Sequence, residues 1–147
     1  MTDEVKNVVE VKAEAMESFI EERKINGIQM SSPNENVRLF RTNLLIEGQA
    51  LPVFIVIDTT VYTLIQVVIA KVPENKNSQV LAYANELNDL FGMLKYHINK
   101  AGDLILTFSI PAVNDKFDPA LVVALLDQVK AHLEATYASV MKKIWQD

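Results

Sequence analysis

The segment that most constrains the fold is residues 51–72, which is largely apolar but contains Pro52, Asp58 and Gln66. Its other residues are mainly Val, Ile, Thr, Tyr and Phe, the types that favour β-strands. An aspartate near the centre of a membrane helix would cost about 3 kcal/mol on insertion scales. We therefore interpret the segment as two buried strands that turn at residues 58–60, and not as a membrane span.

The second of these strands, residues 61–70, is apolar on both of its faces. One face carries Val61, Thr63, Ile65, Val67 and Ile69. A strand of this kind has to be covered on both faces, either by the chain's own helices or by a partner such as an identical subunit. If a partner covers the second face, the predicted interface residues are Tyr62, Leu64, Gln66 and Val68.

Hydrophobic periodicity and turn residues predict the remaining elements. Helical spacing indicates helices over residues 3–26, 78–91 and 119–144, with Thr2, Asn77 and Asp118 as their expected caps. Residues 28–36 have the composition of a loop, with Ser31-Ser32-Pro33-Asn34 as its strongest part. The predicted strands are residues 36–46, 51–57, 61–70, 94–98 and 104–110.

The order of these elements is α-β-β-β-α-β-β-α, with the strands grouped instead of alternating with helices. Short gaps between consecutive strands favour antiparallel pairing. The sequence therefore predicts an α+β fold with an antiparallel five-stranded sheet and three helices. We expect a single domain over residues 1–147, in which an N-terminal helix within residues 1–27 packs on a core of residues 36–145.

Composition excludes several classes of function. The 147 residues include no cysteine, which rules out disulfides, thiolate metal sites and cysteine nucleophiles. The four glycines are too far apart to form a phosphate-binding loop. A net charge of −5 argues against general binding of nucleic acid or of anionic membranes. No export signal, with a basic start followed by an apolar stretch, is visible at the N-terminus, so we expect a cytoplasmic protein. The residue chemistry suggests neither a cofactor nor a metal.

The side chains offer little evidence of catalysis. The two histidines, His97 and His132, have neither a metal-ligand spacing nor an identifiable orienting partner, so we interpret them as surface and boundary residues. Phe117, Tyr137 and Trp145 are expected to close the core where the last helix crosses the sheet. An alternative is that they border a small-molecule pocket between the sheet and this C-terminal helix. We do not expect an enzyme.

The first predicted helix carries an acidic ridge, which we define as Glu10, Glu14, Glu17 and Glu21. Their spacing of three and four residues places all four on one helix face. Such a run is commonly a solvated face, in which like charges cost a few tenths of a kcal/mol per pair. The alternative is a surface that is complementary to a basic partner.

The second half of the chain resembles a known family in its packing and turn motifs. Those motifs are Asn85-Glu86-Leu87-Asn88 in a helix, the hairpin of residues 93–110 with Ala101-Gly102-Asp103 at its turn, and Phe117-Asp118-Pro119 before the last helix. Together with the element order, they resemble the type III secretion chaperone-like fold and its YbjN-like branch. The resemblance implies a non-enzymatic fold, and secretion chaperones are small acidic cytoplasmic dimers that hold a partly unfolded protein segment.

The sequence therefore predicts a non-catalytic protein-interaction module with a chaperone-like or regulatory role, acting as a homodimer. An unidentified protein partner is also expected, whereas nucleic acid and membranes are not. The alternative function is a small-molecule binding or sensing domain that uses a pocket between the sheet and the C-terminal helix.

Overall fold

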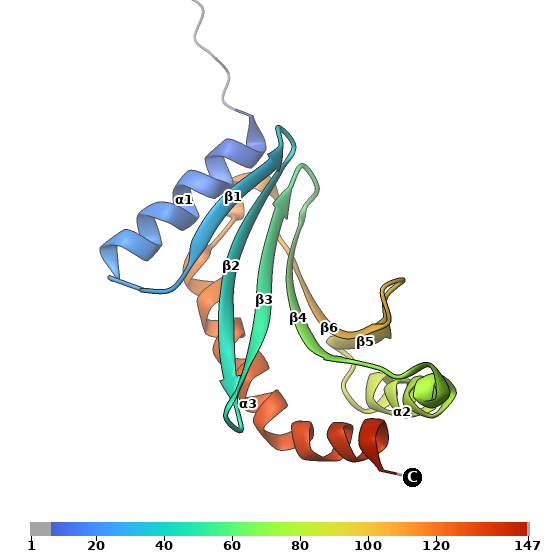
Figure 1. The fold of residues 1–147 in the computed structure, drawn as a ribbon. Helices are drawn as coiled ribbons and strands as arrows, with labels where there is room; N and C mark the ends of the chain where they lie inside the picture. The colour runs from blue at the N-terminus through green and yellow to red at the C-terminus, as the bar shows by residue number, and fades with distance from the viewer. Residues whose placement is uncertain (1–6, 147) are drawn as a thin grey trace, which may run out of the picture.

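Within residues 7–146, which the computed structural model describes, six strands form one antiparallel sheet and three α-helices accompany it (Figure 1). This confirms the predicted α+β class, the antiparallel pairing and the three helices. The helices are α1 (Val8–Glu22), α2 (Asn77–Leu90) and α3 (Pro119–Trp145). The strands are β1 (Gln29–Asn34), β2 (Val37–Ile46), β3 (Gln49–Asp58), β4 (Tyr62–Lys71), β5 (Leu94–Ile98) and β6 (Asp103–Pro111).

The sheet has six strands and not the predicted five, because β1 occupies the segment that we expected to be a loop. The strand order is β1-β2-β3-β4-β6-β5. Gln29 lies opposite Arg41 and Met30 lies opposite Phe40, so β1 pairs along β2 at one edge of the sheet. The Ser-Pro-Asn composition of β1 is typical of loops, and Pro33 is tolerated because it lies in an edge strand.

Two tight turns set the register of the central strands. Between β2 and β3, Glu47 (φ 47°) and Gly48 (φ 80°) both adopt the left-handed conformation, as a two-residue hairpin with matching twist requires. Between β3 and β4, the Asp58 carboxylate accepts hydrogen bonds from the Thr60 amide (2.8 Å) and hydroxyl (2.6 Å). This bonding confirms Asp58 as a turn former.

The helix α1 is shorter than predicted at its C-terminal end. It begins after Asn7, whose side chain accepts from the Val9 amide, whereas the expected cap Thr2 lies outside the described residues. It ends before Lys24, which adopts a left-handed φ of 53°. The Lys24 and Ile25 amides donate to the carbonyls of Glu21 and Ile20, which is the Schellman pattern of helix termination.

Of the other two predicted helix caps, one is confirmed and one is wrong. Asp118 caps α3 as predicted, since its carboxylate accepts from the Ala120 amide at 3.0 Å. The prediction that Asn77 caps α2 was wrong. Asn77 is the first residue of the helix, and a 3-10 turn over Glu74–Lys76 leads into it. A second 3-10 turn, Asn114–Lys116, precedes α3.

The core lies between one face of the sheet and the helices α1 and α3, which lie on the same side of it (Figure 1). The helix α2 packs beside β5 and against α3. On the sheet, alternate residues of β3 and β4 are fully or almost fully buried in this core. They include Val53, Ile55, Ile57, Ile65 and Val67, and they face buried helix residues such as Met16, Val129 and Leu133.

One buried residue on α1 is charged. Lys12 is only 2% exposed, and its ammonium donates to the carbonyls of Asp58 (3.2 Å) and Thr60 (2.6 Å). Burial lowers the pKa of Lys12 from its ordinary value, and the nearby Asp58 carboxylate opposes this change. The lysine therefore joins α1 to the β3–β4 turn.

Candidate functional site

The residues that we predicted as an interface lie on the sheet face opposite the core, which we call the outer face. Tyr62, Leu64, Gln66 and Val68 alternate along β4 with buried residues of the core. Tyr62 is 50% exposed, and the other three are partly exposed. Since α1 and α3 both pack on the core face, the hypothesis that the chain's own helices cover both faces is wrong for the described residues.

The strand register extends this apolar character to neighbouring strands. Leu64 lies opposite Val56 on β3, and Val68 lies opposite Ile105 on β6. Gln66 lies between Phe54 of β3 and Thr107 of β6. The Thr107 hydroxyl is buried and has no hydrogen-bond partner among the described residues. The outer face is thus mainly apolar and partly exposed on β3 and β4, whereas on β6 it carries Thr107, Ser109 and the buried Ile105.

A second candidate is a pocket of about 320 Å³ between the end of α2, the β5–β6 hairpin and α3. This pocket lies between the sheet and the C-terminal helix, where we considered one, but none of Phe117, Tyr137 and Trp145 lines it. Trp145 is 62% exposed and does not close the core as expected, whereas Tyr137 is buried. The pocket is lined by Phe91, Met93, Leu94, Phe108, Val129 and His132, together with Gly92 and Gln128.

His132 has a partner that sequence analysis missed. The hydroxyl of Tyr96, on β5, lies 2.5 Å from the His132 Nε2 atom. The Thr136 hydroxyl donates to the His132 carbonyl at 3.0 Å, and the Phe91 ring meets the imidazole edge-on. Tyr96 is 2% exposed, and burial raises its pKa to about 12, so it stays protonated at physiological pH. Burial also lowers the pKa of His132 below its ordinary value of 6.5.

This arrangement predicts that acid destabilises the fold through His132. The unfolded chain binds a proton near pH 6.5, whereas the folded chain resists it because burial disfavours the charged imidazole. The free energy of unfolding should therefore fall as the pH drops through 6.5, until the lower folded-state pKa is reached. Urea unfolding at a series of pH values measures this slope. The pH dependence of the free energy of unfolding should weaken in His132→Gln and persist in the matched variant His97→Gln. An unchanged pH dependence in His132→Gln would show that His132 is not its source.

His97 lies on the outer face of β5, opposite Ile105, and is partly buried. It is thus separate from His132, which belongs to α3 on the core side. Among the described residues, no group of three His, Cys, Asp or Glu side chains could hold a metal ion. None of the helices within residues 7–146 combines the length and apolar character needed to cross a membrane.

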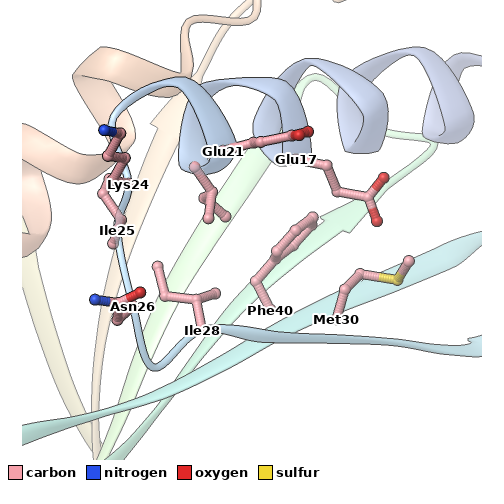
Figure 2. A pocket seen from close by; sticks show the side chains of 9 residues that line it. Glu17, Glu21, Lys24, Ile25, Asn26, Ile28, Met30 and Phe40 are labelled. Atoms are coloured by element: carbon pink, nitrogen blue, oxygen red, sulfur yellow. The ribbon is translucent and has the colours of Figure 1, made fainter.

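A third candidate is an open groove of about 710 Å³ between α1 and β1 (Figure 2). Ile28 just before β1, Met30 of β1 and Phe40 of β2 project toward the helix, as Figure 2 shows. Glu17 and Glu21, two members of the acidic ridge, project from the helix above them. All four ridge glutamates are exposed, and two of them, Glu17 and Glu21, border this groove. Sequence analysis missed this groove because it predicted β1 as a loop.

The two edges of the sheet differ in how they are covered. At the β5 edge, the Asn88 side chain of α2 accepts from the Tyr96 amide (2.7 Å) and donates to the Tyr96 carbonyl (3.1 Å). The amide side chain thus bonds the strand as a neighbouring strand would. At the opposite edge, all six residues of β1 are exposed, and among the described residues β1 pairs with β2 alone.

No protein-family model matches this chain, and no curated protein matches it. A similar solved structure is a chain from the heterodimeric complex ExoU-SpcU of the type III secretion system of Pseudomonas aeruginosa. The similarity covers 84% of this chain and 88% of that chain, with 16% sequence identity and a TM-score of 0.43. A likeness this distant says nothing about partners, which have to be inferred from the chain's own surfaces.

Proposed function

We propose that this protein is a non-catalytic, cytoplasmic protein-interaction module that acts as a homodimer through the outer face of its sheet. The observation that carries the proposal is the mainly apolar, partly exposed surface of β3 and β4, on the face opposite the one that α1 and α3 cover. Exposed apolar surface of this kind marks interaction sites in soluble proteins. The chaperone-like or regulatory role follows the resemblance of element order and hairpin motifs.

A second copy of the chain suits this surface for two reasons. A two-fold interface is self-complementary, and a mainly apolar patch can pack against its own copy without opposing like charges. Charged side chains are also absent from the β4 part of the patch, where Tyr62, Leu64, Gln66 and Val68 lie. Depletion of charge at the centre is the composition typical of interface cores.

The test is the mass of the native protein in solution. Light scattering at micromolar concentration should give twice the chain mass of 16.5 kDa. A single 16.5 kDa species across that range would contradict the homodimer. Native mass spectrometry on the same sample checks the stoichiometry independently.

The alternative function, small-molecule binding, is favoured by the 320 Å³ pocket beside His132. Its volume lies at the lower end of the range of ligand pockets, and its walls are apolar apart from His132 and Gln128. The same native mass spectra distinguish the two functions. A monomer with a small co-purified mass would support the alternative, whereas an unliganded dimer would support the interaction module.

A further inference from the structure

We infer that the pocket between α2, the β5–β6 hairpin and α3 binds a neutral, planar aromatic molecule that carries a hydrogen-bond acceptor. This inference rests on the alternative function proposed above and deepens it, because it names the class of ligand that this pocket takes. The residues that line the pocket include none of the residues proposed for the dimer interface on β4, so the two proposals concern different surfaces.

The walls of the pocket favour a flat aromatic ligand. Phe91 and Phe108 both line it, and the Phe91 ring meets the His132 imidazole edge-on, with the ring centroids 4.6 Å apart. Aromatic rings prefer edge-to-face and offset contacts, so a further ring against these side chains gains more than its buried area alone. Met93, which is 68% exposed, adds a flexible thioether of the kind that packs well against rings.

The lining residues also limit the charge and the size of the ligand. The described part of the chain contributes no Asp, Glu, Lys or Arg side chain to this pocket. A charged ligand would therefore lose water there without gaining an opposite charge, which disfavours it. The volume of about 320 Å³ lies at the lower end of the range of ligand pockets, so a molecule of one or two fused rings is the expected size.

The hydrogen bond between Tyr96 and His132 determines which ring nitrogen carries the imidazole proton. A tyrosine hydroxyl is protonated at neutral pH and has a single hydrogen to donate. Its oxygen lies 2.5 Å from the His132 Nε2 atom but 3.4 Å from the Thr136 Oγ1 atom, whose own hydrogen goes to the His132 carbonyl. Bonds that N–H groups donate are longer, about 2.7–3.2 Å, so we assign Tyr96 as the donor and Nε2 as the acceptor.

This assignment places the hydrogen of the neutral imidazole on the other ring nitrogen, Nδ1. Within residues 7–146, no hydrogen bond reaches the His132 Nδ1 atom, and it is not one of the buried polar atoms that lack a partner. It is therefore accessible on an imidazole that lines the pocket. A ligand lone pair can accept its hydrogen, whereas a ligand that only donates cannot bond to it. The exposed Gln128 amide, the other polar lining group, both donates and accepts, so it does not discriminate between ligands.

The experiment compares the binding of quinoline and of indole to the full-length protein by NMR, at about pH 7.5, where histidine is neutral. Both probes are neutral molecules of two fused rings, but quinoline offers only an acceptor and indole only a donor. Quinoline should shift the Gly92 and Leu94 amide signals in a saturable way. It should bind about fivefold more tightly than indole, the factor that one hydrogen bond supplies.

Two variants test the assigned donor. Tyr96→Phe keeps the buried ring but removes the hydroxyl that fixes the tautomer, so Nδ1 can also act as an acceptor and the preference for quinoline should fall to within about twofold. His132→Phe keeps a ring in the pocket wall without a donor, and it should also lose the preference. The matched variant His97→Phe lies on the outer face of β5 and should keep it. If His132→Phe fails to fold, Tyr96→Phe still tests the assignment.

The outcomes separate the pocket from the class of its ligand. If neither probe binds, the alternative function fails together with the inference. If indole binds as tightly as quinoline, or if Tyr96→Phe keeps the native preference, the pocket binds small molecules but the inferred class is wrong. Light scattering on the same samples reports the dimer separately, so none of these results is confused with loss of the dimer.

Discussion

The variant Leu64→Lys with Val68→Lys should be monomeric at concentrations where the native protein forms a dimer. Both side chains lie on the outer face of β4, where Leu64 is between Val56 of β3 and Ser109 of β6, and Val68 is opposite Ile105 of β6. In a two-fold interface each substitution occurs twice, so four ammonium groups would have to lose water in the apolar contact. We expect the dissociation constant to rise by roughly a hundredfold or more, because central interface residues contribute about 2 kcal/mol or more. Light scattering over a dilution series measures the change.

A control is needed because lysine at a half-buried strand position also affects the monomer. The matched variant Leu90→Lys with Leu121→Lys replaces two exposed apolar residues on α2 and α3, and it should remain dimeric. If the β4 variant fails to fold, Leu64→Thr with Val68→Thr keeps strand-forming residues and should still weaken the dimer. A folded β4 variant that dimerises as tightly as the native protein would show that the outer face is not the interface.

The variant Asn88→Ala should lower the free energy of unfolding by about 2 kcal/mol. It removes two hydrogen bonds to the Tyr96 backbone and leaves both backbone groups without their partner. The loss should also speed hydrogen exchange at the Tyr96 amide, because the donor at this edge is no longer held. Urea unfolding and exchange followed by NMR give the two measurements.

Two comparisons give this result a specific meaning. Asn85→Ala changes an exposed residue on the same helix and should stay within about 0.5 kcal/mol of the native protein. Asn88→Asp retains an acceptor for the Tyr96 amide but places a second acceptor against the Tyr96 carbonyl, so it should also destabilise. An Asn88→Ala protein as stable as the native one would mean that water replaces these bonds without cost.

Local signals were sufficient for most of the fold. Gly48 marks the β2–β3 turn because glycine readily adopts a positive φ, and Asp118-Pro119 marks the start of α3 as a cap followed by a proline in the first turn. The strand β1 could not be predicted locally, because its polar residues form a strand only through pairing with β2. Likewise, α1 ends at Glu22 and not near Asn26 because Lys24 takes a left-handed conformation that its residue type does not favour.

The candidate sites were predictable only where one element was sufficient to define them. The alternation along β4 assigned Leu64 and Val68 to the second face correctly, because side-chain direction in a strand has a period of two. The partnership of Tyr96 with His132 joins β5 to α3 across 36 residues, so it depends on tertiary packing. The burial of Lys12 could have been predicted, because its position in the sequence lies in the apolar stripe of α1 between Val9 and Met16.

The unequal edges of the sheet limit how far it can grow. If two copies met through their β1 edges, each end of the joined sheet would be a β5 strand already bonded by Asn88. A third copy would find no free strand to pair with, so this mode of association would close after two molecules. Open-ended stacking of strands, the route to fibres, needs two unprotected edges. One amide side chain on α2 thus leaves the sheet with a single open edge and limits its growth by strand pairing to two copies.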